Sequence, residues 1–353
     1  MAPVALRSQE KKRSSNAAPA TKSGRLARSP TPDEVTRRPA TTHSAPFILP
    51  GECPVDLAGS LHTKTMRPPT RLIVNADDFG YFDGVCRGIL EAARCGAVTA
   101  TGVMANGPAL ERWVNELRGM PSVSAGVHLN ATLGRPLTPE MSRHLTGGVF
   151  PAKGRLASAI LLGRLPHELL LREWRAQIRR CLDLGLRVEF LNSHEHVHVL
   201  PGLASRVFAL AEEFGIRQVR PPAPEFLPRV TPASVLRSLV MGAARALAPA
   251  NRPELPALIG VNPSGRLDLG YCRWRFARLT AGRAYELMCH PGRVDPLAVG
   301  DPRVSAYHDW EGELALLTSG AFRDLLRSHG VELVSFATLA RHQHDEVTNV
   351  GRA

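Results

Sequence analysis

From residue 71 onward, short apolar runs alternate with longer stretches in which apolar residues recur every three or four positions. The short runs, bounded by turn residues, predict buried strands, whereas the longer period predicts amphipathic helices. The predicted strands occupy residues 71–76, 97–106, 123–130, 187–199, 216–222, the first part of 284–292 and the first part of 331–340. The predicted helices occupy residues 84–96, 108–119, 168–185, 202–215 and 320–330. This alternation predicts an α/β fold with a parallel sheet, and the number of units favours a distorted TIM-like (β/α) barrel over an open sheet.

Two segments interrupt the alternation and are predicted to be insertions at one end of the barrel. They lie near residues 135–165 and 224–282, and the second includes an apolar stretch at 234–248 that predicts a helix. Insertions that follow the carboxyl ends of barrel strands usually build a substrate site or a lid over it. We therefore expect both segments to border the substrate site.

Residues 1–66 differ in composition, because they are rich in Ala, Pro, Ser, Thr and Arg and lack apolar periodicity. This composition predicts a disordered basic extension in front of one barrel domain over residues 67–345. The many Arg and Ser residues faintly resemble a transit peptide. Met66 stands just before the first strand, so a dispensable extension, or a coding region assigned too long at its start, is an equally open interpretation.

The net charge of +12 is densest in the extension, where ten Lys and Arg stand against five Asp and Glu. The chain shows no helix-turn-helix or zinc-finger pattern, so we expect no nucleic-acid partner. No apolar run approaches the roughly 18 residues of a membrane span, and no secretory signal is recognisable. The six cysteines form no CxxC pair, and their scatter suits reduced thiols in a cytoplasmic protein.

Polar side chains that could carry chemistry stand where predicted strands end. Asp77 and Asp78 follow the first strand, and His128 lies near the end of the third. Adjacent carboxylates repel each other and are costly to bury without a cation. Taken alone, an exposed acidic turn and a structural histidine remain alternative interpretations.

The stretch FLNSHEHVHVLP carries His194, His196 and His198 at every second position. On an extended strand their side chains would stand about 6.5 Å apart, which is too far for one metal ion to bind all three. We therefore expect His194 to be a ligand, His196 to line or support the site, and His198 to be structural. His290, in a His-Pro-Gly turn after a later strand, is a candidate proton donor, with a turn that caps a carbonyl as the alternative.

These residues are more informative together than singly, because the carboxyl ends of barrel strands meet on one face. One Asp and two His would offer an ion one oxygen and two nitrogen ligands and leave open positions for water and a carbonyl. The second Asp could then act as general base and His290 as general acid. The ion could be zinc, or a harder divalent ion such as magnesium, manganese or iron.

The motifs NADDFG, GVHLN, NSHEHVH, VRPP and MCHPG, in this order, resemble the YdjC-type carbohydrate deacetylases, a group that includes chitooligosaccharide deacetylase and hopanoid-associated HpnK-like proteins. The resemblance extends over about residues 70–340. It implies a distorted TIM-like barrel and a hydrolase that removes acetyl groups from oligosaccharides or glycolipids containing N-acetylglucosamine, through metal-activated water. It also implies one divalent ion, magnesium first with zinc or another ion as the alternative, and is compatible with a homodimer.

Position by position, the resemblance assigns Asp78, His128 and His194 as metal ligands. Asp77 matches the general base of the family. His290 falls in the late His-Pro-Gly motif, where it implies an acid or a substrate contact.

Four further residues are expected to contact the substrate or to support the ligands. Arg220 matches an Arg that positions Asp77 or the substrate, and His196, Asn130 and Glu195 complete the set. The basic extension and the long 224–282 segment depart from the family pattern, so localisation and the identity of the sugar stay open.

Two other functions remain as alternatives. The first is a barrel metallohydrolase that acts on a different amide or ester, although a two-metal site would need more bridging carboxylates than these motifs offer. The second is a catalytically inactive sugar-binding relative, against which the presence of both Asp77 and Asp78 argues.

Overall fold

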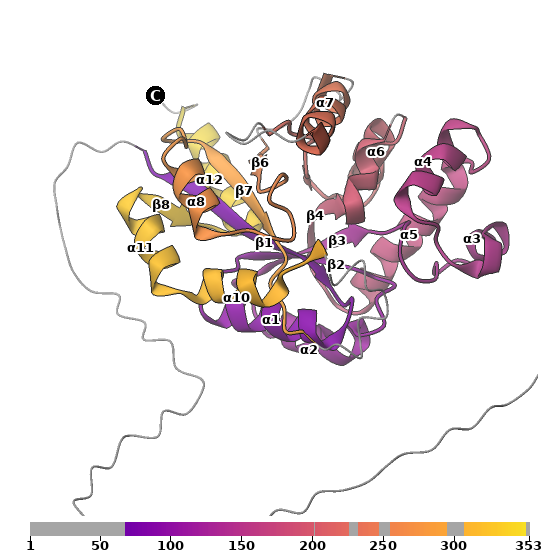
Figure 1. Ribbon diagram of the computed structural model, residues 1–353, viewed down its shortest axis with the longest axis horizontal. Helices are drawn as coiled ribbons and strands as arrows, with labels where there is room; N and C mark the ends of the chain where they lie inside the picture. The colour runs from indigo at the N-terminus through magenta and orange to yellow at the C-terminus, as the bar shows by residue number, and fades with distance from the viewer. Residues whose placement is uncertain (1–67, 201, 226–231, 247–254, 295–306, 351–353) are drawn as a thin grey trace, which may run out of the picture. The chain divides into compact units, whose positions relative to one another are not determined.

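The computed structural model describes residues 68–200, 202–225, 232–246, 255–294 and 307–350. Within them, eight parallel strands form one sheet in the order β5-β4-β3-β2-β1-β7-β6, and β8 pairs with β1 (Figure 1). The strands are β1 Thr70–Phe79, β2 Ala100–Val103, β3 Ser124–Leu129, β4 Val188–Ser193, β5 Gln218–Val219, β6 Ala257–Ile259, β7 Ala284–Cys289 and β8 Val331–Leu333. The expected distorted (β/α) barrel is confirmed, and it is incomplete, since no ladder joins β5 to β6 among the described residues.

Most helices are amphipathic, and several of them, such as α1 and α5, pack one face against the sheet. They are α1 Asp83–Arg94, α2 Leu110–Arg118, α3 Pro139–His144, α4 Lys153–Leu161, α5 His167–Asp183, α6 Ala204–Glu213, α7 Pro232–Ala246, α8 Leu269–Phe276, α10 Trp310–Thr318, α11 Gly320–Ser328 and α12 Phe336–Val350, with the 3₁₀ segments η1 Thr146–Gly148 and η2 His194–Val199. Val85 and Ile89 are buried on α1, and Trp174 and Ile178 on α5. Apolar residues three or four positions apart therefore form the buried stripe that the sequence pattern predicted.

The central strand is β1, and its position determines where the two adjacent aspartates lie. Residues 72–74 are fully buried, as expected for a strand covered on both faces. Along one edge of β1, β7 pairs with residues 71–76. Along its other edge, β1 pairs with β8 near its start and with β2 near its end. Asp77 and Asp78 therefore reach the carboxyl edge in the middle of the sheet.

The strand predicted over residues 187–199 is too long, because β4 ends at Ser193. The next six residues form η2, in which Glu195 and His196 have φ angles of 52° and 56°. Left-handed residues cannot continue a strand, and two in succession turn the chain sharply. The polar and apolar residues of this stretch alternate as they do in a strand, so periodicity alone could not show where β4 ends.

The two interrupting segments contain regular structure. Residues 135–165 include α3, η1 and α4, and residues 224–282 include the expected helix α7. The second segment also contains α8 and β6, and β6 joins the sheet by pairing with β7. Patterning missed β6 because three residues are too few to show a period, and it also missed α10 and most of α12.

The predicted basic extension over residues 1–66 lies outside the described residues. Among the helices that the structure describes, none combines the length and the apolar character that a membrane crossing requires.

Helix α1 packs closely against the loop that follows β7. A Cβ atom on Gly88 would lie 2.4 Å from the Cα of Gly292, and one on Gly84 would lie 1.9 Å from the carbonyl oxygen of Arg293. Both distances are far below van der Waals contact. The loop that carries His290 therefore rests directly on the backbone of α1.

We expect Gly88→Ala to lower the free energy of unfolding by about 1–3 kcal/mol, although alanine favours helices, because the added methyl group has no room. Gly242→Ala is the matched control, since a Cβ there would have no described heavy atom within 4 Å apart from its chain neighbours and the backbone of its own helix. This control should raise the free energy of unfolding by about 0.5–1 kcal/mol. Urea denaturation measures both values, and equal effects of the two substitutions would rule out the close packing.

Candidate active site

A cavity of about 540 Å³ lies at the carboxyl ends of the strands. Its lining includes Asp77 and Asp78 at the end of β1, His128 on β3, His194 directly after β4, and His290 directly after β7. These five side chains come from segments far apart in the sequence. The parallel sheet brings them into one cavity.

The backbone at Asp78 explains how two neighbouring aspartates line the same cavity. Consecutive side chains of a regular strand point to opposite sides. Asp78 has a φ angle of 73°, and the pairing of β1 with β2 is irregular between Ala76 and Phe79. The left-handed conformation breaks the alternation, and such strain in a non-glycine residue is typical of functional sites.

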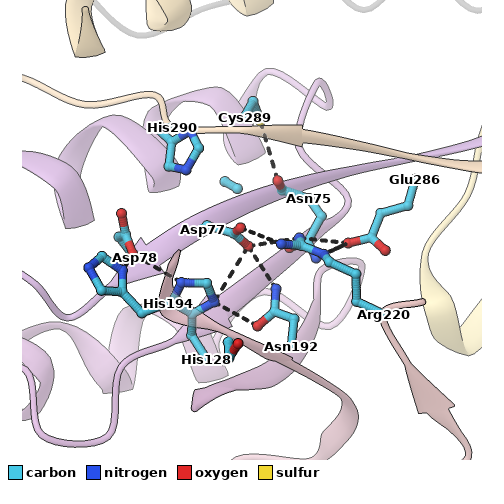
Figure 2. A network of polar contacts seen from close by, with 12 residues as sticks. Asn75, Asp77, Asp78, His128, Asn192, His194, Arg220, Glu286, Cys289 and His290 are labelled. Atoms are coloured by element: carbon cyan, nitrogen blue, oxygen red, sulfur yellow. Dashed lines mark hydrogen bonds and ion pairs between the residues drawn. The ribbon is translucent and has the colours of Figure 1, made fainter. Parts of the chain in front are cut away.

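Asp78, His128 and His194 form a compact group (Figure 2). Oδ1 of Asp78 lies 2.9 Å from Nδ1 of His194 and 3.2 Å from Nε2 of His128. One ligand atom from each residue lies within 4.8 Å of the other two, and the described chain contains no second group of this kind. One carboxylate oxygen and two ring nitrogens at this spacing fit a single divalent ion with open coordination positions.

Asn192 determines which nitrogen of His128 faces this group. A carboxylate can only accept, so the side-chain amide of Asn192 donates to Oδ1 of Asp77, at 2.8 Å. The amide oxygen of Asn192 then lies 2.7 Å from Nδ1 of His128. Nδ1 must carry the proton in this contact, which leaves the lone pair of Nε2 available for a metal ion.

Arg220, directly after β5, lies between two buried carboxylates (Figure 2). Its guanidinium donates to both oxygens of Asp77, at 2.6 and 2.9 Å, and to Oε1 of Glu286, at 2.8 Å. Asn75 donates to the same oxygen of Glu286 at 2.7 Å. Buried charges are tolerated when they are paired and hydrogen-bonded, so the members of this network depend on one another.

The two aspartates are kept ionised by different neighbours. Burial would raise the pKa of Asp77, but the charge and hydrogen bonds of Arg220 bring it below its ordinary value. Burial would also raise the pKa of Asp78, but His194 and His128 bring it well below its ordinary value. Near neutral pH, one carboxylate is therefore bound to a guanidinium and the other to two imidazoles.

The other two histidines of η2 have different surroundings. Nε2 of His198 lies 3.1 Å from the carbonyl oxygen of Arg220, and its Nδ1 lies 2.6 Å from Oγ of Ser193. Burial and the charge of Arg220 lower the pKa of His198 to about 3, so this ring stays neutral and links the ends of β4 and β5. His196 lines the cavity, and its Nδ1 has no hydrogen-bond partner among the described residues.

His290 is held through its backbone while its ring faces the cavity. Its N–H donates to Glu313, whose other carboxylate oxygen accepts from the N–H of Leu267 at 3.0 Å. Nδ1 of His290 has no hydrogen-bond partner in the described part of the chain. The ring of His308 lies 4.9 Å from that of His290 and stacks on Trp310 at 5.0 Å.

Three residues expected to contact the substrate or support the ligands have distinct positions. Arg220 does not line the cavity and contacts Asp77 instead. Asn130 is also outside the lining, because its side-chain oxygen accepts from the N–H groups of Thr132 and Leu133 and holds the loop after β3. Glu195 lines the cavity and is exposed.

Sequence reasoning missed Asn192, Glu286 and His308. Glu286 interrupts the apolar strand β7, and a charge within a buried strand is itself a signal of an ion pair. Asn192 stands two positions before His194, but an amide has no ligand spacing that could reveal it. No pattern in the sequence points to His308.

Comparisons with known proteins found a family profile, several relatives and a solved structure that match this chain. Residues 71–328 match the profile of the family described as YdjC-like protein. A carbohydrate deacetylase of Geobacillus stearothermophilus is 33% identical over 275 residues, which cover 76% of this chain and 97% of that protein. A chitooligosaccharide deacetylase of Klebsiella pneumoniae strain 342 is 35% identical over 278 residues, which cover 75% and 97%. A solved structure of a proposed cellobiose-phosphate cleavage protein from Enterococcus faecalis V583 is similar in fold, with a TM-score of 0.60 and 23% identity over 77% of this chain and 99% of that one.

We expect Asn192→Leu to weaken metal binding by about 10–100-fold, because His128 loses the acceptor that fixes its protonation and orientation. Gln218→Leu is the control, since Gln218 is a buried amide on the neighbouring strand β5. Calorimetric titration with zinc measures both affinities. Unchanged affinity in Asn192→Leu would show that the amide does not orient His128.

Proposed function

Because the chain belongs to the YdjC-like protein family, we propose that it is a carbohydrate N-deacetylase, a hydrolase that removes acetyl groups from N-acetylated sugars. The names of the Geobacillus and Klebsiella relatives support a carbohydrate deacetylase. The observation that carries the proposal is that two adjacent carboxylates in one cavity have different partners. Asp78 contacts two histidines, whereas Asp77 contacts a guanidinium. These different partners lead us to assign Asp78 as a metal ligand and Asp77 as a general base.

We propose Asp78, His128 and His194 as the residues that hold one divalent ion. A bound ion supplies polarisation of the acetamide carbonyl and a lower pKa for water. Two ring nitrogens favour zinc or a similar ion, because magnesium, the first expectation from the family resemblance, prefers oxygen ligands.

Asp77 is the general base of the proposed reaction. Its Oδ1 accepts from Asn192 and Arg220, whereas Oδ2 accepts a single hydrogen bond, from Arg220, among the described residues. A lone pair of Oδ2 is therefore free to take a proton from the attacking water. Arg220 keeps the carboxylate ionised and fixes its direction.

His290 is the general acid, which protonates the amine nitrogen as the C–N bond breaks and acetate leaves. Its ring lines the cavity, and Glu313 holds its backbone in place. Burial and the neighbouring His290 lower the pKa of His308 to about 3. The neutral His308 ring therefore adds no positive charge beside His290 at neutral pH.

We expect Asp77→Asn to reduce deacetylation by about 10²–10⁴-fold, because the base is lost, while the affinity for metal is retained. Acetate release is measured on N-acetylglucosamine oligomers and on N-acetylglucosaminyl lipids, with and without a chelator. Asp324→Asn, which changes an exposed carboxylate on α11, is the control.

Full activity of Asp77→Asn would show that this residue is not the base. Hydrolysis of another amide or ester, with no acetate released from either sugar substrate, would favour a different metallohydrolase. Metal binding without hydrolysis of any of these compounds would indicate an inactive relative.

We expect the acid limb of the pH–rate profile to move upward in Arg220→Lys, by about one pH unit or more. The folded pKa of Asp77 lies below the ordinary value, so its ionised form persists until the pH falls through that lowered pKa. Without the paired guanidinium, burial raises this pKa, and protonation begins at higher pH. Arg175→Lys, on an exposed ion pair with Glu213, is the control.

The profile is measured together with metal affinity at each pH, so that loss of the ion is recognised separately. An acid limb that stays in place while metal remains bound would mean that Arg220 does not set the protonation of Asp77.

A further inference from the structure

Helix α7 carries an apolar face that the described chain leaves exposed. Leu236, Leu239 and Val240 are 64%, 61% and 46% exposed, and Ala243 is also exposed. Positions i, i+3, i+4 and i+7 form one stripe along a helix. Large aliphatic side chains gathered in one exposed stripe are typical of an interaction surface.

The opposite side of α7 is also apolar and belongs to the cavity wall. Met241 and Ala244 are buried in one cluster with Val261 and Met288, and Met241 lines the cavity. The buried side accounts for the packing of α7 on the domain, so it does not explain the outer stripe. Figure 1 shows α7 at the margin of the described helices, away from α1, α2 and α10.

The charge of α7 indicates which kind of partner fits the outer stripe. Its sequence PASVLRSLVMGAARA contains two arginines and no acidic residue, and Arg245 is exposed in its last turn. The whole chain carries a net charge of +12. A second copy would bring another positive chain to this face, whereas an anionic lipid surface complements it. An exposed aliphatic face on a helix that carries arginine and no acidic residue is a feature of helices that lie in a membrane interface.

We propose that the outer face of α7 docks the protein onto an anionic lipid bilayer, with Leu236, Leu239 and Val240 entering the headgroup boundary. The proposal rests on the exposed stripe and the charge of α7, and it holds whichever substrate the cavity takes. Because Met241 on the same helix lines the cavity, the bilayer surface would lie one helix diameter, ~10 Å, from the cavity wall.

Co-sedimentation of the full chain with vesicles tests this docking. The vesicles contain equal parts of phosphatidylglycerol and phosphatidylcholine, and phosphatidylcholine vesicles give the uncharged comparison. We expect binding to the anionic vesicles that weakens at least about tenfold when Leu236→Glu and Leu239→Glu are combined.

The control combines Leu161→Glu and Leu162→Glu at the end of α4, because those leucines are 68% and 63% exposed. It adds the same charge to the same basic chain, so it separates α7 from the general attraction of a positive protein. We expect this control to bind as the unchanged chain does. Circular dichroism and zinc titration verify folding, and a Leu236→Asn, Leu239→Asn pair replaces the glutamates if they disturb it.

Three results would overturn the proposal. The first is that the unchanged chain does not bind anionic vesicles, and the second is that the α7 and α4 variants bind equally. In the third, light scattering without lipid shows a dimer that only the α7 substitutions dissociate, which would make this face a contact between copies of the chain.

Discussion

The pairing of Asp77 with Arg220 is the interaction on which the site depends. Two adjacent carboxylates can both be buried and ionised only if each has its own positive or hydrogen-bonding partners. Arg220 supplies them to Asp77 and is itself balanced by Glu286, while His128 and His194 surround Asp78. Loss of the guanidinium would leave two uncompensated carboxylates in the core, so stability and chemistry rest on the same contact.

The fold brings these groups together, and two local distortions of the backbone orient their side chains. Parallel strands place their carboxyl ends at one edge of the sheet, which is why distant segments share a cavity. The left-handed backbone at Asp78 turns the second aspartate into that cavity, and the left-handed residues Glu195 and His196 turn the chain within η2, directly after β4 ends. Both distortions border the cavity, where strained backbone is commonly found.

Much of the architecture was predictable, because buried strands and amphipathic helices have distinct periods. The convergence of Asp78, His128 and His194 followed from their places at strand ends and from the family resemblance. Short or irregular features were not predictable: β6 has three residues, and the end of β4 depends on φ angles that no sequence period encodes. Supporting groups such as Asn192 were hidden because their partners lie far away in the chain, and α7 could be placed as a helix but not as one with an exposed apolar face.

The central claim is that the two neighbouring carboxylates have different partners, one a metal ion and the other Arg220. Anomalous diffraction at the zinc edge, from crystals grown with zinc, tests it most directly. We expect one strong peak, from a zinc ion bonded to Asp78, Nε2 of His128 and a ring nitrogen of His194, with both oxygens of Asp77 still accepting hydrogen bonds from Arg220. A peak bonded to Asp77, or no peak at this cluster, would contradict the assignment of ligand and base.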